Sequence, residues 1–284
     1  MPTIREKRVY DEATTPTPVF VAAEQGLVLA RISADKVGEF GLERRCTARD
    51  VAVGADGTLA LATDEATLVA PEANTEQFRE TGFGPATAVG TVEGSDTAVV
   101  AADESGEISR LSIADDGAGE ADWETLGTVD DVRAIDGRLV AAADGVHRVA
   151  VDSVVDAGLD DARDVAARGA PLAATGAGLY ELGNGWMVAR DGPYSTVATD
   201  GEQAHAVDAE GSILGREEDG GEWVELDPPT DEPIADFTYT DDAVVAATEP
   251  GSLLVDAGDG WRSRRVGVTG VAAIAAAPPT PFEK

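Results

Sequence analysis

The sequence predicts an all-β protein, a closed β-propeller of seven four-stranded blades, with one blade completed by both termini. Three observations predict this fold. A short Ala- and Val-rich segment recurs in steps of roughly 32 to 40 residues, which is the period of a propeller blade. An aromatic residue follows most copies, and each unit divides into four short apolar runs separated by turns. No sustained helical periodicity interrupts the pattern.

The first marker of the repeat is an alanine inside an apolar run that ends at a polar or glycine turn. The second marker is a large ring on the expected fourth strand, and all four tryptophans belong to this set. Because the gap between blades widens with radius, small residues are expected near the axis and rings at the outside. The alanines are Ala22, Ala62, Ala101, Ala141, Ala173, Ala206 and Ala246, and the rings are Phe40, Phe78, Trp123, Trp186, Trp223 and Trp261.

The unit over residues 48–83 illustrates the blade. Residues 50–53, 59–62 and 67–70 read as three strands, and the segment around Phe78 reads as the fourth. The sequence Ala-Asp-Gly at 55–57 predicts a tight turn. The unit that follows residue 129 lacks the aromatic marker of the fourth strand, so Val154-Val155 is its expected fourth strand.

Closure of the ring follows from the two ends of the sequence. Residues 12–18 are too rich in Thr, Pro and Glu for an inner strand, whereas residues 270–276 (GVAAIAA) suit one. Pairing the two ends removes open sheet edges. We therefore expect an N-terminal arm over 1–16 and one propeller domain over 17–284. The expected blades are 17–43 with 270–277, 48–83, 86–127, 129–158, 162–190, 194–226 and 234–268.

Two turns carry acid, glycine and tryptophan in the order of an Asp box, at residues 216–223 (REEDGGEW) and 256–261 (DAGDGW). They lack the serine or threonine that opens a complete Asp box. With these turns and its seven units, the whole chain resembles the uncharacterised haloarchaeal β-propeller proteins. That resemblance implies the fold and no particular activity.

Charge is the most unusual feature of the composition. The 54 acidic residues outnumber the 21 basic ones, giving a net charge of −33, and only Lys7, Lys36 and Lys284 are lysines. Such a surface suits molar salt, in which a Debye length of about 3 Å screens repulsion. It disfavours nucleic-acid binding, which needs clustered bases. No apolar stretch approaches the ~18 residues of a membrane span. We expect a halophilic cytoplasmic protein without nucleic-acid or membrane partners.

Turns after second strands and the starts of inner strands should meet at one mouth of the central channel. Their side chains would form a ring dominated by acids, able to bind a cation or a basic segment of a partner. Residues 48–51 and 162–165 repeat the tetrapeptide Ala-Arg-Asp-Val. The candidate binding residues are Arg49, Asp50, Asp64, Asp103, Asp131, Asp144, Arg163, Asp164, Asp208 and Asp236.

Catalytic motifs are missing from this sequence. His147 and His205 lack metal-ligand spacing to another His or Cys, and Cys46 is expected to be a small strand or loop residue. We predict no catalytic residue and no cofactor, and the sequence leaves metal binding open. The favoured function is a non-catalytic interaction or scaffold propeller with an unknown protein partner. The alternative is a cation-dependent hydrolase or lyase with its acidic site at the channel mouth.

Overall fold

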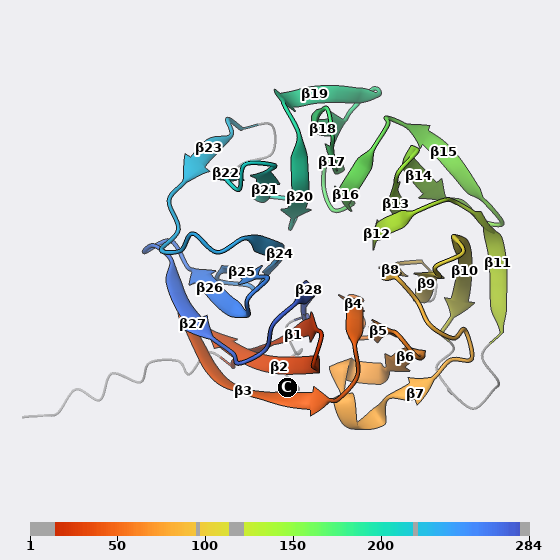
Figure 1. Ribbon diagram of the computed structural model, residues 1–284, viewed down its shortest axis with the longest axis horizontal. Coiled ribbons are helices and arrows are strands. Elements are labelled where there is room, and N and C mark those ends of the chain that lie inside the picture. Colours follow the sequence, from red (N-terminus) through yellow and green to blue (C-terminus); the bar gives the residue numbers. More distant parts are fainter. Residues whose placement is uncertain (1–14, 95–96, 114–121, 218–220, 279–284) are drawn as a thin grey trace, which may run out of the picture.

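A computed structural model describes residues 15–94, 97–113, 122–217 and 221–278. These residues form seven four-stranded antiparallel sheets arranged as blades around a central channel (Figure 1). The predicted fold class is therefore confirmed. The predicted N-terminal arm falls almost wholly outside the described residues. None of the helices in the described ranges has the length and apolar character needed to cross a bilayer.

Each blade runs from an inner strand at the channel to an outer strand at the circumference (Figure 1). From inside to outside, blade 1 has β28 (Val271–Ala276), β1 (Thr17–Ala23), β2 (Gly26–Ser33) and β3 (Lys36–Arg44); blade 2 has β4 (Ala48–Val53), β5 (Leu59–Thr63), β6 (Thr67–Ala70) and β7 (Arg79–Glu80); blade 3 has β8 (Ala88–Val92), β9 (Ala98–Ala102), β10 (Glu107–Ser112) and β11 (Trp123–Thr128); blade 4 has β12 (Val132–Asp136), β13 (Leu139–Ala142), β14 (Gly145–Val149) and β15 (Val154–Gly158).

The remaining blades continue in the same order. Blade 5 has β16 (Ala162–Ala166), β17 (Leu172–Thr175), β18 (Gly178–Leu182) and β19 (Trp186–Asp191); blade 6 has β20 (Tyr194–Thr199), β21 (Ala204–Asp208), β22 (Ile213–Arg216) and β23 (Val224–Leu226); blade 7 has β24 (Ile234–Tyr239), β25 (Val244–Thr248), β26 (Ser252–Asp256) and β27 (Arg262–Arg265). Two short 3-10 helices, η1 (Pro71–Ala73) and η2 (Thr75–Gln77), precede β7.

Blade 1 joins the two ends of the chain. Strand β28 pairs antiparallel with β1, with Ala22 opposite Ala273 and Val19 opposite Ala276. The backbone N–H of Ala277 also donates to the Pro18 carbonyl at 2.8 Å. The C-terminal strand thus supplies the inner strand that the N-terminal part of the chain lacks.

Side-chain size follows radius in most blades, although Tyr194, Phe237 and Tyr239 lie on inner strands. The second strands β5 and β9 are buried along their whole length and consist mainly of Ala, Val and Leu. Rings lie on or next to the outer strands, and two of them connect neighbouring blades. Trp123 Nε1 donates to the Thr81 carbonyl at 3.0 Å, and Trp186 Nε1 donates to the Ala157 carbonyl at 2.9 Å. The fourth strand of blade 4 is β15, which begins at Val154 as predicted.

Glycines allow close backbone packing at the start of the third strands. Gly106 and Gly251 have φ angles of 80° and 91°, which a residue with a Cβ rarely adopts. A Cβ on either glycine would lie about 2 Å from the carbonyl oxygen of Val129 or Val268. Glycine is therefore required at both positions by conformation and by space.

Candidate functional site

The channel along the propeller axis contains a cavity of about 380 Å³ lined by the seven inner strands. Six of these strands carry a β-bulge close to their first residue. A bulge re-aims side chains locally, so it places equivalent residues of different blades at the same mouth of the channel. We call this end the entry mouth. The bulged residues are Arg49, Arg133, Arg163, Ser195, Ala235 and Ala272, and all six line the cavity.

The residue after the bulge is an aspartate in blades 2, 5 and 7, and its carboxylate links two blades. Asp50 accepts hydrogen bonds from the N–H of Val51 in its own strand and from the N–H of Val89 in blade 3, both at 2.8 Å. Asp164 makes the same two contacts with Val165 and Val197.

Asp236 repeats the arrangement with Phe237 at 2.6 Å and Ile274 at 2.8 Å. An inner strand is a sheet edge, so its channel-facing N–H groups have no strand to pair with. An unpaired buried N–H is costly, and each of these carboxylates satisfies two of them. The three aspartates therefore act first as connections between adjacent blades.

Burial disfavours the charge on these carboxylates. Desolvation raises the pKa of Asp50 and of Asp236 to about 7, although their backbone N–H donors favour the ionised form. Desolvation, followed by the negative charge of Asp236, raises the pKa of Asp164 well above its ordinary value. Asp136, at the other end of the channel, also has a pKa raised by burial. Asp50 and Asp236 therefore take up a proton near neutral pH.

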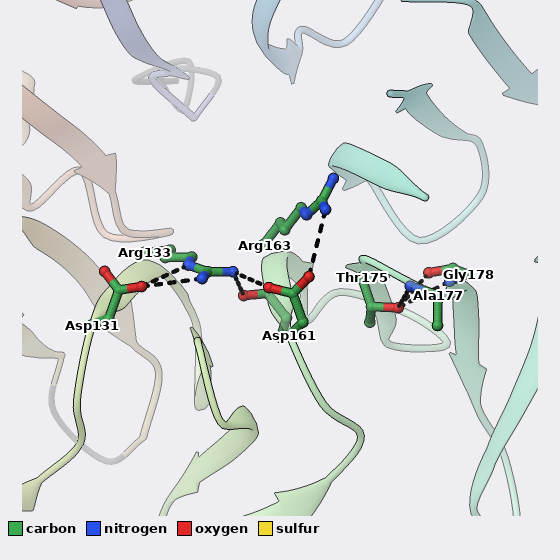
Figure 2. Close-up of polar contacts among 8 residues, drawn as sticks. Asp131, Arg133, Asp161, Arg163, Thr175, Ala177 and Gly178 are labelled. Atoms are coloured by element: carbon green, nitrogen blue, oxygen red, sulfur yellow. Dashed lines mark hydrogen bonds and ion pairs between the residues drawn. The ribbon is translucent and has the colours of Figure 1, made fainter. Parts of the chain in front are cut away.

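Two of the arginines at the entry mouth also connect neighbouring blades. Arg49 of blade 2 pairs with Glu104 of blade 3 at 2.7 Å. Arg133 of blade 4 lies between the carboxylates of Asp131 and Asp161, at 3.0 Å and 2.7 Å (Figure 2). It also donates to the Ala162 carbonyl of blade 5 at 3.1 Å. These guanidinium groups are held by acids that the protein itself supplies.

Arg163 is held less closely. In Figure 2 it lies above Asp161, and its Nη2 is 3.4 Å from Oδ2, the Asp161 oxygen that does not bind Arg133. That distance is well beyond the 2.7–2.9 Å typical of a charge-assisted hydrogen bond. Arg163 also borders a hollow at the entry mouth that extends over blades 6, 7 and 1.

The structure places the predicted site residues in two groups. Arg49, Asp50, Arg163, Asp164 and Asp236 line the channel together. Four of the other five belong to surface turns or loops, and Asp208 is the last residue of β21. Asp64, Asp103 and Asp208 accept backbone N–H groups of their own blades, Asp131 pairs with Arg133, and Asp144 contacts His147 Nε2 at 2.8 Å.

The predicted acidic ring therefore divides by role into channel carboxylates and turn carboxylates. Among the described residues, no group of three or more His, Cys, Asp or Glu side chains is placed to hold a metal ion. The single cysteine, Cys46, is partly buried, and burial raises the pKa of its thiol.

His205 lies between blades 6 and 7, stacked near Phe237 and Tyr239. Its Nδ1 is 2.9 Å from the Tyr239 hydroxyl, which donates to the Ala198 carbonyl at 3.0 Å. Burial lowers the pKa of His205 to about 4, so the ring is neutral near pH 7.

Sequence reasoning missed several residues of the channel. Arg133 occupies the same bulge position as Arg49, a match visible when Val-Arg-Ala-Ile at 132–135 is aligned with Ala-Arg-Asp-Val at 48–51. The loss of the aspartate from the tetrapeptide hides this match. The other missed residues lie towards the far mouth and follow no repeated motif; they are Asp136, Arg168, Asp200 and Tyr239.

A family model described as an HVO_0234-like β-propeller matches residues 3–277, which is nearly the whole chain. The chain belongs to the HVO_0234-like β-propeller family. This family is named after a haloarchaeal protein, which agrees with the resemblance noted from the sequence. No curated protein sequence matches this family member.

Two solved structures resemble this HVO_0234-like propeller in fold. One is a chain in the crystal structure of a nidogen/laminin complex, with a TM-score of 0.61, 10% identity, and coverage of 93% of this chain and 99% of that one. The other is the computationally designed Ika8 protein, with a TM-score of 0.57, 12% identity, and coverage of 94% of both chains. At such low identities these similarities concern the fold alone.

Proposed function

We propose that this propeller is a non-catalytic binding scaffold that docks a protein partner on the face around its entry mouth. The proposal rests on one observation: the charged residues of the channel are engaged in contacts within the protein itself. Asp50, Asp164 and Asp236 bind backbone N–H groups of neighbouring blades, and Arg49 and Arg133 bind the protein's own acids. Groups engaged in this way rigidify the ring, and a rigid ring with varied loops suits binding.

The variable part of this face is one position per blade, in the turn between second and third strands. We call it the rim position. In blades 2, 4, 5, 6 and 7 its backbone N–H donates to a carbonyl just before the inner strand, so its placement is the same while its side chain varies. The rim residues are Glu24, Asp64, Glu104, Ala143, Gly176, Ala209 and Glu249.

The alternative, a cation-dependent hydrolase or lyase, has less support. It would use the channel carboxylates as ligands, but both oxygens of Asp50, Asp164 and Asp236 already accept a backbone N–H. A metal would have to compete with these contacts or share the remaining lone pairs.

The test is affinity capture from lysate in molar KCl, followed by mass spectrometry. Glu210→Arg with Glu249→Arg reverses two exposed charges near the entry mouth without touching the contacts between blades. Asp241→Arg with Asp242→Arg makes the same change in the β24–β25 turn, at the opposite mouth, and serves as the control.

A stoichiometric partner whose capture changes in the first variant and stays the same in the control is the expected result. Unchanged capture by both variants would exclude the entry-mouth face. Metal analysis of the same purified protein tests the alternative, since a stoichiometric divalent ion without a protein partner would favour the hydrolase or lyase.

A further inference from the structure

The two copies of Ala-Arg-Asp-Val differ in what their arginines meet on the next blade. In the first copy, Arg49 of blade 2 forms a 2.7 Å ion pair with Glu104, the rim residue of blade 3. In the second copy, Arg163 of blade 5 faces blade 6, whose rim residue is Ala209. An alanine has no group with which to pair the guanidinium.

The equivalence of Glu104 and Ala209 rests on two matching turns. Asp103 accepts the N–H groups of Ser105 and Glu107, and the N–H of Gly106 donates back to the Asp103 carbonyl. Asp208 makes the same contacts with Glu210, Ser212 and Gly211. The residue after the aspartate is Glu104 in one turn and Ala209 in the other.

The aspartates of the two tetrapeptides confirm that the blades superpose locally. Asp50 binds the N–H of Val89, which pairs with Ala101, and Asp164 binds the N–H of Val197, which pairs with Ala206. The two aspartates therefore make matching contacts with the next blade. Blade 6 differs from blade 3 in two ways, because β20 carries a bulge at Ser195 that β8 lacks and its rim residue is Ala209 instead of Glu104.

The surroundings of Arg163 leave room for an external group. Its described ion pair is the 3.4 Å contact with Asp161, whose other oxygen already binds Arg133 at 2.7 Å. The bulged residues of the next three blades are small, so a hollow opens beside the guanidinium. The residues of this hollow that bear on the argument are Ser195, Ala209, Ala235 and Ala272.

We propose that Arg163 and the hollow beside Ala209 form the docking point for a carboxylate side chain of the partner protein. The inference rests on the proposed function and specifies the chemistry of its contact. The partner's carboxylate takes the place that Glu104 occupies beside Arg49. The acids Glu210 and Glu249 are exposed around the hollow, and in molar salt a Debye length of about 3 Å limits their repulsion, whereas a direct contact with Arg163 persists.

The probe is acetate, titrated into ¹⁵N-labelled full-length protein in molar KCl at constant ionic strength. The Nε–Hε signals of Arg163 and Arg49 are followed by NMR and assigned with Arg163→Ala and Arg49→Ala. We expect a saturable shift at Arg163, with a half-saturation concentration at least about tenfold below that of Arg49. A tenfold preference is what one charge-assisted hydrogen bond supplies.

Two further variants make the test reciprocal. Ala209→Glu installs the rim carboxylate of blade 3 in blade 6, and it should abolish the response of Arg163. Glu104→Ala removes the partner of Arg49, and it should give Arg49 a response like that of Arg163. Ala209 and Glu104 are both exposed turn residues, so neither change disturbs the core.

Equal responses of Arg49 and Arg163, or an Arg163 response that survives Ala209→Glu, would overturn the proposal. The titration needs no protein partner, so its failure is distinct from failure of the proposed function. If a partner is captured, Arg163→Ala and Ala209→Glu should each release it, and Arg49→Ala should not.

Discussion

The carboxylate of Asp50 and the backbone N–H of Val89 join blade 2 to blade 3 through a 2.8 Å hydrogen bond. Asp50 also accepts the N–H of Val51, so one short side chain satisfies two channel-facing donors. Blades 5 and 7 repeat the arrangement, each with the inner strand of the following blade. Contacts of this kind hold the ring at its narrowest radius.

Asp50→Asn should lower the free energy of unfolding by about 1–3 kcal/mol. The amide keeps one acceptor oxygen but turns an NH₂ group towards the second backbone donor, which is then left unpaired. The measurement is denaturant unfolding at pH 6 in molar KCl, where Asp50, with its pKa raised by burial to about 7, is mostly protonated and the variant changes no charge. Asp130→Asn, a change of the same chemistry on an exposed residue, is the control. A cost no larger than that of the control would show that the interblade bond contributes nothing.

Stability should increase as the pH falls from 8 to about 6.5. Burial raises the pKa of folded Asp50 and Asp236 to about 7, above the ordinary value of an unfolded aspartate. Between these values the folded state binds more protons than the unfolded state, so the free energy of unfolding rises as the pH is lowered. Urea midpoints at constant ionic strength measure this change. Asp50→Asn should flatten the profile, and an unchanged profile would argue against titration of Asp50.

His205 should act against this trend at lower pH. Its pKa is lowered by burial to about 4, so below about pH 6.5 the unfolded state binds a proton that the folded state does not. Stability contributed by this group is present above its unfolded pKa and is lost as the pH falls towards 4. A two-dimensional ¹⁵N–¹H spectrum of the imidazole follows the titration directly.

The same spectrum should show His205 protonated on Nδ1. Tyr239 has one hydroxyl proton and donates it to the Ala198 carbonyl at 3.0 Å. Its oxygen must therefore accept from His205 Nδ1, 2.9 Å away. Finding the proton on Nε2 would mean that the Tyr239 hydroxyl donates to the histidine instead.

Removing residues 271–284 should abolish cooperative folding. The deletion takes away β28, exposes the edge of β1 and removes Ile274, the interblade partner of Asp236. The expected loss approaches the whole stability of a natural domain, on the order of 5–15 kcal/mol. Circular dichroism during thermal unfolding measures it. Removal of residues 279–284 alone leaves β28 in place and should keep a sharp transition; a sharp transition in both truncated proteins would show that closure is dispensable.

The sequence by itself determined the seven repeats, their four strands and closure by the two ends. These follow from local patterns, because the alternation of apolar residues, the turn glycines and the rings of each blade lie within one stretch of the chain. It also selected Arg49, Asp50, Arg163, Asp164 and Asp236, because inner strands begin at a predictable place in each repeat.

Only the tertiary structure decided what these side chains do. The bond from Asp50 to Val89 crosses 39 residues of sequence, and it depends on a bulge that no residue pattern marks. The contrast between Arg49 and Arg163 likewise depends on which rim residue the neighbouring blade presents. The partners lie on different blades, and the packing of one blade against the next brings them together.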